Sequence, residues 1–203
     1  TGNLNFGTAG SVTIPASATF NPVAGTLTLT TTTVAASQTL SLGSGNASII
    51  NTGAISGLAA SANLTINTTG VATIGAVGTN IGIVTVTQSG GTTFASLDAA
   101  TFAITDTADT MTVEVTGDLT VGTAMTVAAG TNDYNVSILG ATNSIAGNTT
   151  FANTGNLTVE GITTFAAGAT KATIGVKSFS GTINATTGNL NFGTAGSVTI
   201  PAS

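Results

Sequence analysis

Short alternations of apolar and polar residues recur along the whole chain. In each alternation two apolar residues stand two positions apart, and a small polar residue, most often Thr, lies between them. The clearest pairs are Leu4 and Phe6, Leu27 and Leu29, Leu64 and Ile66, Leu119 and Val121, and Leu157 and Val159. Because successive side chains of a β-strand point to opposite faces, this spacing puts both apolar side chains on one face. The pattern predicts short strands that bury one face and expose the other.

A turn follows each alternation, and related pieces recur at a loose interval of about 20–25 residues. The piece TGNLNFGTAGSVTI from Thr1 resembles TGDLTVGTAMTVAAG from Thr116 and TGNLTVEGITTFAAG from Thr154. Short strands on such an interval are typical of solenoids, in which every coil stacks on the previous one. We therefore predict an all-β fold, a parallel β-solenoid (β-helix) of about eight or nine coils per 186 residues, with a thin core of Leu, Ile, Val, Phe and Ala.

A β-sandwich is the alternative fold, since it also consists of many short strands with regular turns. The spread of Gly and Asn along the chain disfavours it, because the Asn-Gly and Asp-Gly pairs that are typical of tight hairpins do not occur.

The opening segment of the chain, TGNLNFGTAGSVTIPAS, occurs again without a change as residues 187–203. We interpret residues 1–186 as one full tandem repeat unit of the solenoid and residues 187–203 as the start of the next identical repeat. In a continuous solenoid the second copy should repeat the fold of the first, displaced along the axis by one unit. Leu190 and Phe192 should then point inward as Leu4 and Phe6 do. Separate subunits that stack head-to-tail and donate a terminal segment to a neighbour are the other arrangement that fits the duplication.

The composition excludes several classes of protein. Charged residues make up 4% of the chain, against about 25% in typical soluble domains, and all of them fall between Asp98 and Lys177. No run of 18 apolar residues exists, so this segment has no predicted membrane span. The chain has two lysines and no arginine, which argues against nucleic acid as a partner. A hydrophobic content of 41% with a net charge of −5 argues against disorder.

Catalysis is also disfavoured, because the chain has no His, Cys, Arg or Trp. Asp106 with Asp109 or Asp118 forms a conceivable pair of glycosidase carboxylates, and Tyr134 is the one prominent ring that could stack on a sugar. An exact duplication would copy such a site along a fibre. We predict that the chain is not an enzyme.

The most concentrated polar feature is an acidic cluster formed by Asp98, Asp106, Asp109, Glu114 and Asp118. Residues 105–110 read TDTADT, so Asp106 and Asp109 stand three apart at a predicted turn and form a weak candidate Ca²⁺ site. No other cofactor is predicted. The glycine-aspartate nonapeptide of calcium-binding β-rolls is absent, and the alternative is a solvated loop that keeps a nearly neutral protein soluble.

Threonine runs at residues 26–33 and 85–87 suggest the outward arrays of ice-binding solenoids. Their uneven spacing favours the simpler interpretation that Thr is a good exposed strand residue. Asn3, Asn63, Asn156 and Asn189 recur at turns, where we expect stacked side chains or turn conformations.

The rung pattern and the Thr/Asn/Gly/Ala-rich, cysteine-free composition resemble the β-helical passenger and repeat regions of large repetitive bacterial surface proteins, the autotransporter and filamentous-haemagglutinin class. The resemblance implies an extracellular or cell-surface location in a bacterium or archaeon. We expect a structural, non-catalytic subunit or repeat of an extracellular fibre, sheath or stalk, whose partners are identical copies stacked head-to-tail. The alternative is an adhesin passenger that binds a host or cell-surface ligand.

Overall fold

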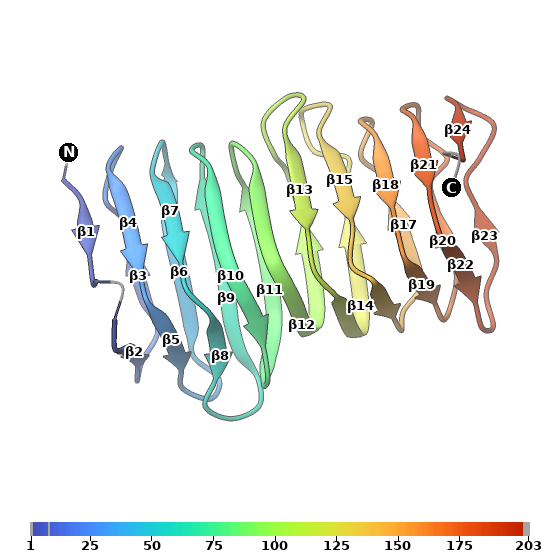
Figure 1. Cartoon of the computed structure of the whole chain (residues 1–203). Helices are drawn as coiled ribbons and strands as arrows, with labels where there is room; N and C mark the ends of the chain where they lie inside the picture. Colours follow the sequence, from blue (N-terminus) through green and yellow to red (C-terminus); the bar gives the residue numbers. More distant parts are fainter. Residues whose placement is uncertain (1, 8, 201–203) are drawn as a thin grey trace.

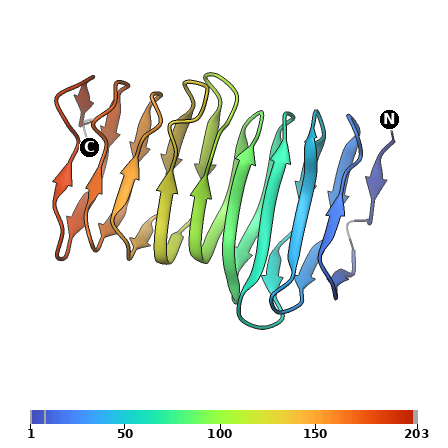
Figure 2. The same cartoon turned by 180° about the vertical axis from the view of Figure 1, so that it is seen from behind.

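The computed structural model describes residues 2–7 and 9–200, and this part of the chain forms 24 β-strands and no helix. The strands wind around one axis as a parallel β-solenoid of about nine turns, with the two termini at opposite ends (Figure 1). Figure 2 shows the same stack of coils from behind. All the strand pairings are parallel, which confirms the predicted solenoid and excludes the sandwich.

Each coil contributes strands to three faces, called here the first, second and third face in chain order. The first face consists of β1 (Leu4–Asn5), β4 (Thr26–Leu29), β7 (Ile49–Thr52), the start of β10 (Ala72–Gly78), the start of β12 (Thr92–Ile104), β13 (Thr112–Val115), β15 (Asn135–Ile138), β18 (Leu157–Val159), β21 (Lys177–Phe179) and β24 (Val198–Thr199).

The second face consists of β2 (Ser11–Ile14), β5 (Thr31–Val34), β8 (Ile55–Gly57), the end of β10, the middle of β12, the start of β14 (Leu119–Val127), β16 (Thr142–Ile145), β19 (Ile162–Phe165) and β22 (Thr182–Ala185). The third face consists of β3 (Ala18–Phe20), β6 (Thr39–Asn46), β9 (Ala62–Thr68), β11 (Ile81–Gln88), the ends of β12 and β14, β17 (Thr149–Phe151), β20 (Ala169–Thr170) and β23 (Leu190–Asn191).

The coil length follows from the register of the first face. Its paired positions run from Leu4 to Val198 in nine steps, each of about 20–23 residues. This range agrees with the interval that the repeats predicted. Part of this variation is absorbed at the corners, and part of it appears as register shifts within the pairings β6–β9, β9–β11 and β12–β14.

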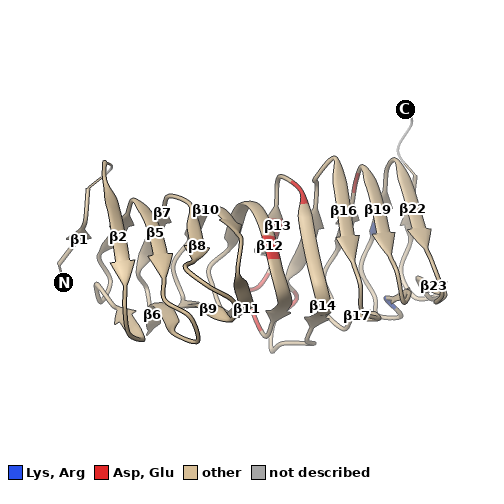
Figure 3. Cartoon of the chain, turned by 90° about the horizontal axis from the view of Figure 1, so that it is seen from below, with Lys and Arg blue, Asp and Glu red and all other residues tan. Residues whose placement is uncertain are grey.

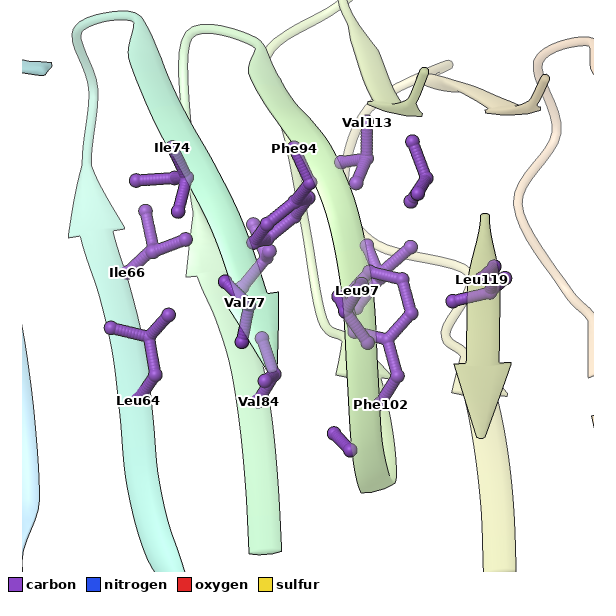
Figure 4. Packing of buried hydrophobic residues seen from close by; sticks show 14 of the residues in the cluster. Leu64, Ile66, Ile74, Val77, Val84, Phe94, Leu97, Phe102, Val113 and Leu119 are labelled. Carbon is purple, nitrogen blue, oxygen red and sulfur yellow. The ribbon is translucent and has the colours of Figure 1, made fainter. Parts of the chain in front are cut away.

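The core is a narrow column of inward-facing apolar side chains. Figure 4 shows Leu64 and Ile66 of β9 beside Ile74 and Val77 of β10, with Phe94, Leu97 and Phe102 of β12 further along the same enclosed space. The rings of Phe94 and Phe102 meet edge to face, with centroids 5.6 Å apart. Four of the five apolar pairs singled out by the sequence are fully buried, which confirms the predicted strand phase.

The first coil is more open than the middle ones. Leu4 is half-buried against the core, whereas Phe6 is 42% exposed and packs edge-on against Phe20 with ring centroids 5.0 Å apart. At the other end, Val198 is 54% exposed and Ile200 is 71% exposed. Both ends of the solenoid therefore present apolar side chains beside unpaired strand edges.

The two copies of the duplicated sequence have the same local structure but lie on different faces. Leu190 packs against the core as Leu4 does, and Phe192 contacts the core residue Phe179. Leu4, however, pairs within the first face, and Leu190 pairs within the third. The expectation of a simple displacement along the axis is therefore wrong, because a change of face accompanies it.

Candidate functional site: the polar corner

The corner that leads from the third face to the first collects most of the charge of the molecule. We call it the polar corner, and its charged residues are Asp106, Asp109, Asp133, Lys171 and Lys177. It is built from the loops 105–111, 128–134, 152–156 and 171–176 and from the first residue of β21. Figure 3 shows most of the acidic residues in the middle of the stack, one more beside β19, the lysines toward the C-terminal end, and no charge in the first coils.

Asp106 ties its own loop to the next coil. Its carboxylate accepts hydrogen bonds from the backbone N–H of Thr107 (2.9 Å), from the backbone N–H and hydroxyl of Thr131 (3.2 and 2.6 Å) and from the Asn132 amide (3.4 Å). Partial burial raises the pKa of Asp106, but these hydrogen bonds together outweigh it and hold the pKa below its usual value. The carboxylate acts as a connection between two coils.

Asp109 lies on the same loop and is exposed. Its carboxylate accepts a hydrogen bond from the backbone N–H of Asp133 at 3.3 Å, and the Asp133 carboxylate accepts one from the hydroxyl of Thr154. The acidic side chains therefore form a chain of contacts from coil to coil. A hollow of about 120 Å³ adjoins Asp106 and is lined by Thr69, Gln88, Ser89, Asp106, Thr107, Ala108 and Asn132.

The structure places the predicted Ca²⁺ residues Asp106 and Asp109 in one loop, but they point to different partners. Over residues 2–7 and 9–200, no group of three or more His, Cys, Asp or Glu side chains lies close enough together to hold a metal ion. The remaining acids of the sequence cluster lie elsewhere: Asp98 and Glu114 belong to strands, and Asp118 lies at the next corner. The calcium site stays a prediction, and the observed donors to Asp106 already occupy both of its oxygens.

Tyr134 is fully buried beneath the polar corner. Its hydroxyl donates a hydrogen bond to the carbonyl of Ala128 at 2.6 Å. Burial, with a further contribution from the negative charge of Asp106, raises the pKa of Tyr134 well above its usual value. A ring in this position cannot stack on a sugar at the surface, so the suggested role of Tyr134 in a carbohydrate site is wrong.

Both lysines are completely buried, which the sequence did not indicate. The Lys171 ammonium donates to the carbonyl of Asn153 (2.6 Å), to the Asn153 side-chain oxygen (3.3 Å) and to the Thr173 hydroxyl (2.9 Å). The Lys177 ammonium donates to the carbonyls of Thr173 (2.8 Å) and Ala195. Burial, followed by the positive charge of Lys177, lowers the pKa of Lys171 to about 8. The two ammonium groups fasten three successive coils through uncharged oxygens.

Other polar side chains serve the same purpose outside the polar corner. Asn3, Asn63 and Asn156 each accept a hydrogen bond from a backbone N–H of the following coil, at 2.9–3.0 Å. Asp118 does the same for Thr142 at 2.9 Å. These side chains join coils by accepting from the backbone, which differs from the predicted side-chain stacking. The predicted turn position of Asn63 is wrong, because Asn63 lies in β9.

The threonine runs divide between faces. Thr26 and Thr28 belong to the first face, Thr30 and Thr32 are buried, and Thr33 belongs to the second face. Another array, on the third face, was not predicted from the sequence. In most coils the outward residue at the middle of this face carries a hydroxyl group. Its register positions are Thr19, Ser41, Thr65, Thr85, Ala103, Thr126, Thr150, Thr170 and Asn191. The varying coil length hides this row in the linear sequence.

The geometry defines the chain as a parallel β-solenoid whose polar groups mainly connect one coil to the next. No family model, no curated protein and no solved structure matches the sequence or the fold. Within the described ranges we find no helix with the length and apolar character needed to cross a membrane.

Proposed function

We propose that the chain is a non-catalytic structural segment of an extracellular fibre, sheath or stalk of a bacterial or archaeal cell, and that this fibre extends by head-to-tail stacking of β-solenoid units. One observation carries the proposal. The segment whose sequence repeats the N-terminus is already seated on the stack, with Leu190 paired to Ala169 and Val198 paired to Lys177. The start of a second unit therefore extends the solenoid without a break.

The polar corner supports a structural role. Hydrogen bonds between coils engage Asp106, Lys171 and Lys177, the three charged residues there that are not exposed. Groups that are held in this way connect the coils of a stack and are poorly placed for chemistry on a substrate. The resemblance to repetitive bacterial surface proteins agrees with this role and with a location outside the cell.

A tandem protein tests the proposal. We would append residues 18–203 after Ser203, so that the chain contains two successive units, and measure its length by small-angle X-ray scattering and electron microscopy. A coil advances about 4.8 Å, so we expect one straight rod that is about 40 Å longer than the single chain. Two compact particles joined by a flexible connection would overturn the proposal.

A matched pair of variants in the tandem protein controls for nonspecific effects. Leu190 and Asn191 are neighbours in β23, but Leu190 packs against the core and Asn191 points to solvent. Leu190→Asp should bend or open the rod at the junction, because it places a charge in the core. Asn191→Asp should leave the rod straight. Equal behaviour of the two variants would contradict a continuous core at the junction.

An adhesin role is the second candidate, and the hydroxyl row of the third face favours it. Hydroxyl groups spaced about 4.8 Å apart along a flat face suit a ligand with a repeating polar surface, such as a cell-surface glycan. The test is binding of the intact chain to a glycan array. Thr85→Lys on the third face should weaken such binding, whereas Thr33→Lys on the second face should not.

A further inference from the structure

The first halves of the duplicated segments have the same local backbone structure, whereas in the second halves β2 has four residues and β24 has two. Leu4–Asn5 and Leu190–Asn191 form strands of the same length at corresponding positions. In both copies the following Gly has a positive φ, 83° at Gly7 and 65° at Gly193. The backbone N–H of this glycine donates to the preceding Asn side chain, at 2.7 Å in the first copy and 2.9 Å in the second.

Each half of the segment nevertheless moves by one face. The Leu4 half lies on the first face in the first copy, and the Leu190 half lies on the third face in the second copy. The Val12 half lies on the second face, and the Val198 half lies on the first. After a whole number of turns each half would return to its original face. Both halves instead lie one face earlier, so they are shifted together.

Counting coils along the faces gives the size of the step. The path from Leu4 on the first face of the first coil to Leu190 on the third face of the ninth coil is eight and two-thirds turns. We propose that successive repeat units of the fibre are related by one third of a turn as well as by an advance along the axis. The third face of one unit then continues as the first face of the next. This inference rests on the proposed tandem continuation.

The contacts of the second copy show that the third face accepts a segment from the first face. The backbone N–H of Ala169 donates to the carbonyl of Asn189 at 3.0 Å, and that of Lys171 donates to the carbonyl of Asn191 at 2.9 Å. The ring of Phe192 packs on Phe179 with centroids 4.4 Å apart. The seat provides both the strand pairing and the apolar contact that the segment needs.

A repeat of a whole number of coils would require a different register. Nine complete coils would place Leu190 on the first face directly above Lys177. The stretch of chain from Lys177 to Leu190 is much shorter than the full coil that runs from Lys177 to its observed partner Val198. So short a connection cannot complete a turn of this size, and the segment therefore occupies the third face.

The one-third step has a consequence for the surface of the fibre. Any feature that is confined to one face of a unit, such as the polar corner or the hydroxyl row, would point in three directions in three successive units. The original orientation would return after three units, which together make 26 coils. The fibre would therefore present the same chemistry on all of its sides.

Cysteine cross-linking in the full-length chain tests the register, because the natural chain has no cysteine. Thr170 and Asn191 are paired neighbours on the third face. Adjacent strands lie about 4.8 Å apart, within the Cα separation that a disulfide bridges. We expect the Thr170→Cys, Asn191→Cys protein to cross-link on mild oxidation or with a short thiol-specific reagent, and the product to revert on reduction of the disulfide.

If the repeat were a whole number of coils, a different pair of cysteines would cross-link. There Asn191 would lie above Ser178, so the Ser178→Cys, Asn191→Cys protein would cross-link and the first pair would not. Ser178→Cys with Thr199→Cys is the positive control, since these residues are paired on the first face. Cross-linking of Ser178→Cys with Asn191→Cys, without cross-linking of the Thr170 pair, would overturn the inference.

The tandem protein separates this inference from the proposed function. In a continuous solenoid Asn191 lies below Thr28 of the second copy, as Asn5 lies below Thr28 in the first, whatever the rotation. Cross-linking at this junction together with the Ser178 pair would retain the continuous fibre and reject the one-third turn. Loss of the junction cross-link, with the Thr170 pair intact, would reject the continuous fibre.

Discussion

Replacing Lys171 with methionine removes a buried positive charge while keeping a long, flexible side chain. In the natural chain the ammonium is fully buried, and its three acceptors are a carbonyl, an amide oxygen and a hydroxyl, all uncharged. Hydrogen bonds to such groups compensate only part of the cost of taking a charge out of water. The Lys171→Met variant therefore reports how much this buried charge costs the fold.

The pKa of Lys171 gives the magnitude. It falls from 10.5 to about 8 on folding, so the unfolded chain binds this proton more tightly than the folded chain does. The penalty is complete below pH 8 and disappears as the pH rises through 10.5. A difference of about 2.5 pKa units corresponds to about 3 kcal/mol of folding free energy.

The Lys171→Met variant has no titratable group at position 171, and it has lost hydrogen bonds worth about 1 kcal/mol each. We expect its stability to be close to that of the natural chain at pH 7 and clearly lower at pH 10.5. The free energy of unfolding of the natural chain, measured relative to the variant, should therefore rise by about 3 kcal/mol over this range.

Urea unfolding followed by far-UV circular dichroism at intervals from pH 7 to pH 10.5 measures this difference. Amide hydrogen exchange in β20 and β21 reports whether the effect is local to these coils. Thr170→Met, one residue away and facing outward, is the matched control and should show no pH-dependent difference. A constant difference between Lys171→Met and the natural chain at all pH values would refute the reasoning.

Three further predictions concern other parts of the stack. Trypsin should leave the native protein intact, because its only targets, Lys171 and Lys177, are buried; rapid cleavage at either, followed by mass spectrometry, would contradict the fold there. Gly43→Ala should lower the free energy of unfolding by about 2 kcal/mol or more, because Gly43 has a φ of 79° and an added Cβ would lie 2.4 Å from a backbone oxygen of the next coil. Gly78→Ala is the control and should be near neutral, because the space around Gly78 is open. Asp106→Asn should lower the free energy of unfolding by about 1 kcal/mol at pH 7, and the difference should disappear once the pH falls below the lowered pKa of Asp106. A chelator should leave the melting temperature of the natural chain unchanged, and a chelator-dependent shift would favour the calcium site.

The strand pattern and the fold class could be predicted from the sequence, because burial follows the period of two. Leu27, Leu64, Leu119 and Leu157, with the second member of each pair, lie in the core as the alternation requires. The all-β class and the coil interval follow from the same spacing. These features depend on local order along the chain, which a linear pattern records.

Two features of the candidate site could not be predicted, because they depend on contacts between coils. Lysine is a residue type that is seldom buried, and the ammonium groups of Lys171 and Lys177 are buried here because backbone carbonyls of neighbouring coils accept hydrogen bonds from them. The burial of Tyr134 could not be predicted either, because its hydroxyl donates to the backbone carbonyl of Ala128, a group that every residue has. No motif in the sequence marks such acceptors.

The face on which the second copy of the duplicated segment lies could not be predicted from the sequence either. The period of the duplication is compatible with eight coils of about 23 residues or nine coils of about 21 residues, and both values fall in the observed range. The sequence therefore could not exclude a whole number of turns. The pairing of Leu190 with Ala169 on the third face decides the matter, and this contact between two coils leaves no mark in the linear sequence.

The ability of one segment to occupy either the first or the third face bears on how such a gene can change length. If each segment of the sequence could lie on only one face of the coil, only insertions of whole coils would preserve the strand pairing. Here a segment that starts on one side serves equally well on another, as Leu4 and Leu190 show. Unequal recombination could then add or remove material in steps of a single side, and three times as many crossover products would encode an unbroken stack.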